Sequence, residues 1–206
     1  MAIVVHSYEQ PDRFIAGTVG PPGQRTFFLQ AKDGNRVTSV ALEKQQVAIL
    51  AERLDVLLDE ALRRSGGDAA IPAVAPVDLR DGDPLEQPIV EEFRVGTITL
   101  SWDGEDGGVV IELFPVSEVA ASNEDDDSGG GTGEAAIEGE AAVEEVEIEA
   151  DEVLLVKLEP GYARFFARRA LSVVSAGRPA CQFCGGPIDP EGHLCPRANG
   201  FKRIAD

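Results

Sequence analysis

Two short segments decide the fold: FIAGTV at Phe14–Val19 and FRVGTI at Phe93–Ile98. Each has phenylalanine first, glycine fourth and threonine fifth, and the second follows the first at an offset of 79 residues (Phe14 to Phe93). Alternating apolar residues predict that both are strands. Self-similarity of this kind is a reason to look for an internal repeat before choosing a fold.

A second pair of segments supports the repeat. VTSVALE at Val37–Glu43 matches VLLVKLE at Val153–Glu159, at an offset of 116 residues (Val37 to Val153). The two offsets differ by about the length of one acidic segment, so a single insertion in the second copy explains both. The alternative is that similar strand-to-helix transitions share residues by chance.

Each copy is predicted to hold three strands and a helix. The helices show apolar residues at helical spacing, and Pro160 is favoured at a first helical position. Glu43 and Glu159 occupy equivalent places, where a carboxylate meets a helix start. The expected strands are 13–20, 25–32 and 35–43 in the first copy and 92–102, 109–116 and 152–159 in the second, with helices over 44–64 and from Pro160 to Gly177.

These elements predict an α+β fold: two tandem strand-strand-strand-helix repeats, with pseudo-twofold antiparallel sheets packed on two helices. The duplicated body spans 1–178 and precedes a small zinc-ribbon-like module at 179–206. Within the body, copy one covers 12–66, a linker 67–90, and copy two 91–178, with a disordered acidic loop at 117–151.

The charge is concentrated in one stretch. The formal net charge is −19, yet 18 of the 37 acidic residues lie between Asp103 and Glu152, where no lysine or arginine occurs. Residues 117–151 also lack aromatic residues, and such a composition does not bury enough apolar area to order itself. We interpret the loop as a solubilising insertion. A decoy for a basic partner or a mimic of nucleic acid is the alternative.

The composition is that of a globular protein, with 43% hydrophobic residues. No stretch approaches the roughly 20 apolar residues of a membrane helix, and MAIVVHSYEQ lacks the features of a secretory signal. We therefore expect a soluble cytoplasmic protein. Clustered thiols in that compartment suggest metal or redox chemistry rather than a disulfide framework.

The C-terminal tail, CQFCGGPIDPEGHLCPRANG, holds all three cysteines and one of the two histidines. Cys181, Cys184, His193 and Cys195 form a Cys₃His set, which suits tetrahedral zinc. A C-x-x-C turn lets two sulfurs converge on one ion, and the Ile188–Gly192 stretch is typical of a chain reversal. On an extended strand, His193 and Cys195 share a face.

Four protein ligands leave no position for water, so the expected Zn²⁺ is structural. The short tail has little core of its own, and the ion supplies most of its folding energy. A redox pair would favour a βα context, which the tail lacks. A reversible disulfide remains open, although it leaves His193 unexplained.

The segments PDRFIAGTVGPPGQRTFFLQA, VALEKQQVAILAERLDVLLDE and CQFCGGPIDPEGHLCPRANG together resemble an uncharacterised actinobacterial family, domain-of-unknown-function family 3090. The resemblance covers nearly the whole chain except the acidic loop. It implies a bacterial cytoplasmic protein with no assigned activity, and it transfers no catalytic residue. The tail also resembles zinc ribbons, with H-x-C in place of the usual second C-x-x-C.

No catalytic constellation stands out, so we lean against an enzyme. His6 is interpreted as an ordinary surface or strand-edge histidine. AGTVGPPGQR (16–25) lacks the G-K-[ST] of a phosphate loop and is expected to be a hairpin turn. Asp78, Asp81 and Asp83 lack the later glutamate of a calcium loop and are assigned to a solvated linker.

The leading hypothesis is a non-enzymatic binding module that docks or regulates an unidentified protein partner through its zinc tail. Phe201 could instead only pack the tail onto the body. The candidate contacts form a basic-aromatic patch: Arg197, Asn199, Phe201, Lys202 and Arg203.

Two alternatives remain. One is single-stranded nucleic-acid binding, because tandem units of this kind look similar, at fold level only, to PUR-repeat and Whirly-type proteins. That function needs a basic groove and stacking aromatics, for which the candidates are Arg13, Arg25, Lys32, Arg36, Arg94 and Trp102. The other is an enzyme whose site lies between repeats or subunits.

Overall fold

The structure is a computed structural model. It describes residues 3–21, 23–66, 70–116, 150–176, 181–184, 188, 193–197 and 203–204, with only the backbone for 193–194 and 203–204. The prediction that 117–151 is a disordered loop therefore falls almost wholly outside the described residues.

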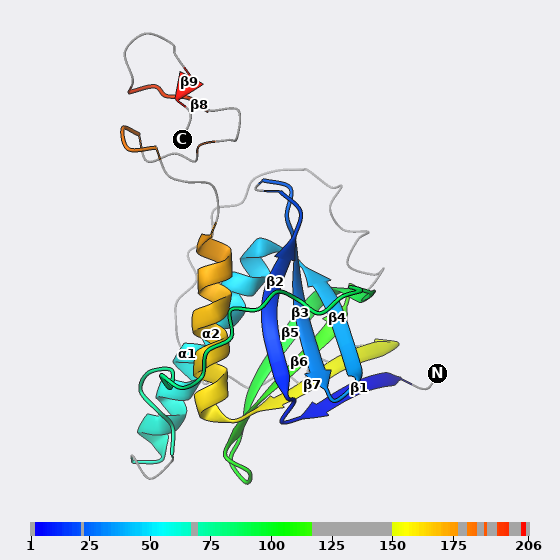
Figure 1. The fold of residues 1–206 in the computed structure, drawn as a ribbon. Coiled ribbons are helices and arrows are strands. Elements are labelled where there is room, and N and C mark those ends of the chain that lie inside the picture. The colour runs from blue at the N-terminus through cyan, green and yellow to red at the C-terminus, as the bar shows by residue number, and fades with distance from the viewer. Residues whose placement is uncertain are drawn as a thin grey trace, which may run out of the picture.

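One seven-stranded sheet and two helices form the body (Figure 1). Its strand order is β1-β7-β6-β5-β4-β3-β2. The strands are β1 (Val4–Glu9), β2 (Arg13–Val19), β3 (Thr26–Asp33), β4 (Arg36–Leu42), β5 (Glu91–Asp103), β6 (Gly108–Pro115) and β7 (Glu152–Leu158), and the helices are α1 (Lys44–Arg64) and α2 (Pro160–Ser175).

The α+β class and the predicted order of three strands and a helix in each half are confirmed. The strands β2, β3 and β4 pair antiparallel in sequence order, and so do β5, β6 and β7. Glu43 and Glu159 are the N-cap residues of α1 and α2, as expected from their equivalent positions.

The two halves join differently from the prediction. Instead of two antiparallel sheets, β4 and β5 pair in parallel and make one mixed sheet. The last strand of the first half thus meets the first strand of the second, which is a head-to-tail contact. A twofold arrangement would bring the same strand of each half together, so the pseudo-twofold expectation does not describe this sheet.

No range was predicted for the strand β1. It pairs in parallel with β7, from Val4 opposite Glu152 to Glu9 opposite Lys157. Parallel pairing joins segments far apart in the chain. No local turn signal therefore announces β1, and of its residues only Tyr8 is buried.

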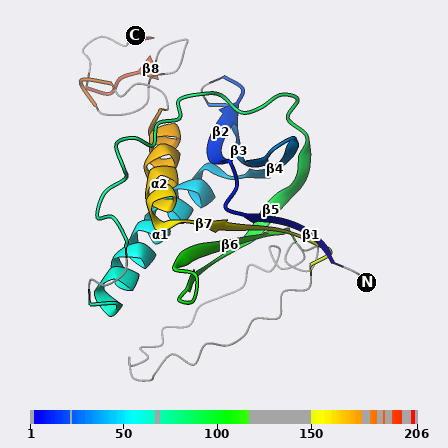
Figure 2. The same ribbon diagram turned by 60° about the horizontal axis from the view of Figure 1, so that its bottom comes forward.

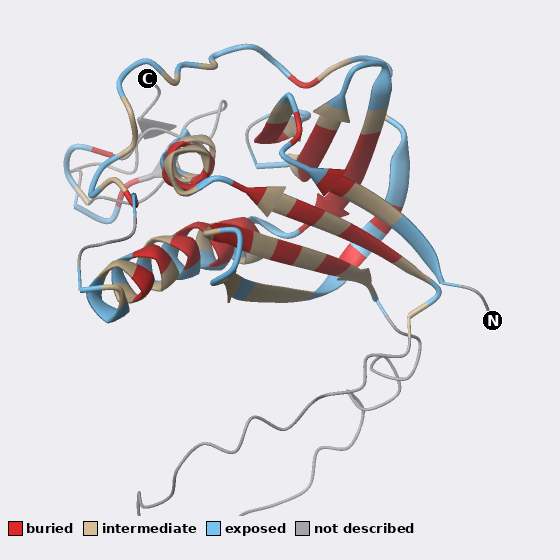
Figure 3. Cartoon of the chain, turned by 90° about the horizontal axis from the view of Figure 1, so that it is seen from below, coloured by how far each residue is buried: buried red, intermediate tan, exposed pale blue. Residues whose placement is uncertain are grey.

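A single core lies between the helices and one face of the sheet. The helices pack on each other, α1 contacts β5 and β3, and α2 contacts β2 and β6. Figure 3 shows the buried residues as bands that recur along the strands and helices. At the centre the rings of Phe14 and Phe166 stack, with centroids 4.7 Å apart. The apolar helix faces are thus core, as predicted.

The opposite face of β2–β4 is covered by residues 76–90, which we call the strap. It crosses this face as an extended segment without helix or strand (Figures 1 and 2). Leu85 packs against Ile15, Phe28 and Ala41 in a second buried cluster. Most of the strap is exposed, Asp78 and Asp83 included, as predicted for a solvated linker, but Leu85 is buried and Asp81 is largely buried. The strands β2–β4 are therefore buried on both faces.

Candidate metal centre

The three cysteines of the tail come together in the structure. Their Sγ atoms all lie within 4.8 Å of one another. Cys181 and Cys195 are buried, and Cys184 is partly buried beside them. Among the described residues of the tail, Ile188 is the only other member of this small cluster, so the thiols are a large part of the core described there. An apolar core of this size stabilises very little by itself.

The spacing of the sulfurs fits a metal ion. The Sγ atoms of Cys181 and Cys195 are 3.7 Å apart. Thiolates bound at about 2.3 Å to a tetrahedral zinc ion lie about 3.8 Å from one another. A disulfide would require about 2.05 Å, so these two residues are not joined by one. The donor set and the spacing therefore both fit a thiolate-binding metal.

Local backbone structure places the cysteines. Residues 182–184 form the turn expected of C-x-x-C. His193 and Leu194 form strand β8, which pairs antiparallel with β9 (Arg203–Ile204), His193 opposite Ile204. The strand expected at His193 is thus confirmed, and His193 is two residues from Cys195. The predicted reversal at 189–192 lies outside the described residues, as does the position of the His193 side chain.

The structure describes two of the five predicted partner contacts, Arg197 and the backbone of Arg203. Asn199, Phe201 and Lys202 lie outside the described residues, and Arg203 is described by its backbone in β9. Arg197 is exposed, and its Nη1 donates to the carbonyl of Phe183 at 3.5 Å. This contact ties the segment after Cys195 to the turn between the first two cysteines.

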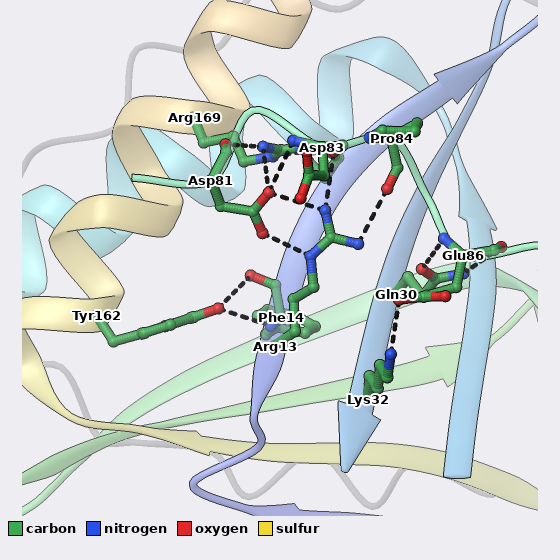
Figure 4. Close-up of polar contacts among 11 residues, drawn as sticks. Arg13, Phe14, Gln30, Lys32, Asp81, Asp83, Pro84, Glu86, Tyr162 and Arg169 are labelled. Carbon is green, nitrogen blue, oxygen red and sulfur yellow. Dashed lines mark hydrogen bonds and ion pairs between the residues drawn. The ribbon is translucent and has the colours of Figure 1, made fainter. Parts of the chain in front are cut away.

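Away from the tail, a polar network joins the strap to the body (Figure 4). Asp81 accepts from Nε of Arg13 at 2.5 Å and from Nη2 at 2.8 Å. Arg169 of α2 also donates to Asp81 and, at 2.6 Å, to the carbonyl of Asp83. The Tyr162 hydroxyl accepts from the N–H of Phe14 at 2.9 Å. Three separate parts of the chain thus meet at Asp81.

The pKa shifts in this network indicate a structural role rather than a catalytic one. The hydrogen bond from Arg13 lowers the pKa of Asp81, although burial opposes the shift. Burial raises the pKa of Tyr162 and lowers that of Arg169. Both carboxylate and phenol are therefore held in their ordinary ionisation states at neutral pH. Sequence reasoning missed the network because its members are distant and follow no spacing.

The residues predicted to contact nucleic acid instead contact other residues of this protein. Lys32 pairs with Glu86 of the strap at 2.6 Å, and Arg94 with Glu43 at 2.8 Å. Arg13 is bound to Asp81, as described above.

The other three candidates also make contacts within the protein. Arg25 donates to the carbonyl of Ala176 at 2.5 Å. Arg36 donates to the carbonyl of Ser7 at 2.7 Å and lies over the Tyr8 ring. Trp102 is half-buried and packs on the core.

A polar cleft of about 380 Å³ lies beside the ends of β1 and β7, lined in part by Glu9, Asp106 and Lys157. Lys157 pairs with Asp103 at 2.7 Å and also with Asp106. These hydrogen bonds raise the pKa of Lys157 above its ordinary value. The lysine is therefore fully protonated near neutral pH, which is the wrong state for a nucleophile or a general base.

Comparison with known proteins places most of the chain in one family. A family model described as protein of unknown function, DUF3090, matches residues 6–195. The chain belongs to this family. The match begins within β1 and ends at Cys195, so the DUF3090 model includes every candidate ligand of the tail. No curated protein and no solved structure matches the chain.

Among the described residues, no helix is long and apolar enough to cross a membrane.

Proposed function

We propose that this DUF3090 protein is a non-enzymatic zinc protein of the cytoplasm, in which a rigid body carries a zinc-ribbon-like tail that docks onto another protein. Cys181, Cys184, His193 and Cys195 hold one structural Zn²⁺. The ion folds the tail and presents the patch of Arg197, Asn199, Phe201, Lys202 and Arg203 to the partner.

The separation of 3.7 Å between the sulfurs of Cys181 and Cys195 carries the zinc assignment. Three thiolates with an imidazole form a closed tetrahedral set that prefers zinc to hard ions such as magnesium or calcium. Nearly all of the apolar contacts in the described part of the tail involve a cysteine. An ion that folds the tail accounts for both the spacing of the sulfurs and the predominance of cysteines in these contacts.

The pairing of charged side chains in the body supports a docking role. On the strap face Arg13 is paired with Asp81 and Lys32 with Glu86, and at the polar cleft Lys157 is paired with two carboxylates. Such an arrangement stabilises a scaffold and leaves little chemistry for turnover. The tail differs, because its patch holds arginines and a phenylalanine, residue types that are enriched at protein interfaces.

We also propose that the body arose by duplication. Phe14 and Phe93 both enter the core, and Ala51 and Ala167, equivalent at the offset of 116, are both buried in their helices. The two N-cap glutamates add a further equivalent pair. Head-to-tail pairing of β4 with β5 is what a tandem repeat makes when each unit presents two different edges.

Metal analysis tests the proposed site directly. Protein purified without chelators should contain one zinc per chain, and cobalt substitution should give the intense absorption bands of tetrahedral thiolate ligation. Cys184→Ser should weaken the charge-transfer band and lower zinc affinity by at least tenfold. Ser175→Ala, at the end of α2, serves as a matched control without a thiol. A chain that carries no stoichiometric zinc, with wild-type and Cys184→Ser spectra alike, would overturn the assignment.

Docking is tested separately by affinity purification of the tagged full chain after nuclease treatment. Partners retained by the wild type should be lost when Phe201 and Lys202 are both replaced by alanine, while zinc content stays the same. Partners lost through nuclease treatment itself would favour the nucleic-acid hypothesis instead.

A further inference from the structure

A second group of side chains whose chemistry could hold a metal ion lies in the body. His6 of β1, Glu152 of β7 and Glu92 of β5 bring one imidazole nitrogen and two carboxylate oxygens within 4.8 Å of one another. His6 Nε2 and Glu152 Oε1 are 2.6 Å apart. His6 and Glu152 are partly buried, while Glu92 is exposed at the outer side of the group.

The sheet brings these three residues together. His6 is two residues from the buried Tyr8 on β1, and Glu152 is two residues from the buried Leu154 on β7. Side chains two apart on a strand share a face, so both point to the core face at the end where β1 and β7 begin. In the pairing of β1 with β7, His6 lies opposite Leu154, and Glu152 is the preceding residue of β7 on that same face.

Glu92 reaches the group because β5 extends beyond its neighbour. In the described residues, the pairing of β5 with β6 starts at Val95, so Glu91–Arg94 run past the end of β6. This part of β5 is held by β4 instead. Although the adjacent Phe93 is buried in the core, a carboxylate oxygen of Glu92 lies within 4.8 Å of the ligand atoms of His6 and Glu152, beyond the end of β6.

We propose that His6, Glu92 and Glu152 form a binding site for one divalent transition-metal ion. A divalent ion bound by both carboxylates would relieve the repulsion between them, and its charge matches their combined charge of −2. The ion would take the place of the proton in the hydrogen bond of 2.6 Å between His6 and Glu152. One nitrogen and two oxygens form a ligand set that suits Mn²⁺, Fe²⁺ or Zn²⁺. Three protein ligands leave positions for water, so this site is open where the tail set is closed.

The two sites differ in the metals that they prefer. Thiolates in the tail are soft ligands, whereas carboxylates bind hard ions such as Mn²⁺. Mn²⁺ therefore probes the site in the body without competing strongly for the tail. The chain also has only two histidines, His6 and His193. A nitrogen signal from a bound Mn²⁺ consequently identifies its ligand after one substitution.

The test uses the full chain with zinc bound in the tail and Mn²⁺ as the probe. Titration followed by electron paramagnetic resonance gives the affinity, and electron spin echo modulation shows whether a ¹⁴N nucleus coordinates the ion. The variants are His6→Gln, Glu92→Gln and Glu152→Gln. His193→Gln is the matched histidine control, and Glu9→Gln removes a carboxylate from the same strand without touching the group.

Wild type should bind one Mn²⁺ with a ¹⁴N coupling, which His6→Gln abolishes and His193→Gln keeps. Glu92→Gln and Glu152→Gln should each weaken binding at least tenfold, and Glu9→Gln less than twofold. Because Glu92 is exposed, its variant tests the site even if His6→Gln fails to fold. Binding without ¹⁴N coupling, or with equal affinity in all variants, would reduce the group to a His6–Glu152 ion pair beside an unrelated carboxylate and overturn the proposal.

Discussion

Arg13 holds Asp81 through two hydrogen bonds, of 2.5 Å and 2.8 Å, although 68 residues separate them in the chain. Arg13 begins β2, and Asp81 lies in the strap between the two halves of the molecule. Arg169 of α2 joins the same carboxylate from the second half. This single side chain thus connects the first half, the strap and the second half.

Replacing Asp81 should loosen all three connections. Asp81→Asn leaves two guanidinium groups without their carboxylate, and the side chains of Arg13 and Asp81 are only 15% and 18% exposed. We expect the free energy of unfolding to fall by about 1–3 kcal/mol, the range for buried hydrogen bonds to charged groups. Urea unfolding measures it. Asp78→Asn removes an exposed carboxylate from the same strap and should change the stability by less than about 0.5 kcal/mol.

The same pair predicts how stability depends on pH. The pKa of Asp81 is lowered in the folded protein from its ordinary value of 3.8, first through the hydrogen bond from Arg13. A lowered pKa contributes stability that is full above the unfolded value and is lost as pH falls through the folded value. Between about pH 5 and 3, wild type should therefore lose more stability than Asp81→Asn. Parallel curves for the two proteins would contradict this role.

Gly17 and Leu85 make a second contact between sheet and strap. A Cβ added at Gly17 would lie 2.5 Å from Cγ of Leu85. Gly17→Ala should therefore push Leu85 off the sheet, and Leu85→Ala alone should cost about 2–5 kcal/mol. Since the second change removes the atoms that clash, the double variant should be more stable than the sum of the two costs implies. Gly104→Ala, with nothing within 4 Å, is the control. Strictly additive costs would rule out the contact.

Because basic side chains of the body are already paired with carboxylates, we expect the protein to bind nucleic acid weakly. Arg13, Lys32 and Arg94 are each paired with a carboxylate of this chain. A labelled single-stranded oligonucleotide should show no salt-dependent shift in anisotropy with the full chain at low salt. Asp81→Asn and Glu86→Gln together would release two of these cations and provide a positive comparison. Tight, salt-sensitive binding by wild type would revive the alternative hypothesis.

Local patterns were enough to predict most elements of the body. Alternation located β2–β7, and helical spacing with Glu43 and Pro160 located both helices. These features depend on neighbours a few residues apart. They also yielded the cysteine cluster, because C-x-x-C is itself a local turn.

Contacts between distant segments could not be predicted in this way. The pairing of β4 with β5, the place of β1 beside β7 and the position of the strap all depend on which surfaces remain uncovered after the halves fold. The same limit applies to the candidate sites. His6 looks ordinary in VVHSYE, and only the sheet brings Glu92 and Glu152 to it.

Removing the metal should unfold the tail and leave the body intact. The cluster of Cys181, Ile188, Cys195 and Cys184 shares no residue with the core between the sheet and the helices. A zinc chelator should therefore abolish amide protection in 181–197, while the melting temperature of the body changes by less than about 2 °C, equivalent to a few tenths of a kcal/mol. Hydrogen exchange with mass spectrometry measures the first and calorimetry the second. Cys184→Ser should reproduce the effect without chelator. Cooperative loss of both parts would show instead that the tail is integrated with the body.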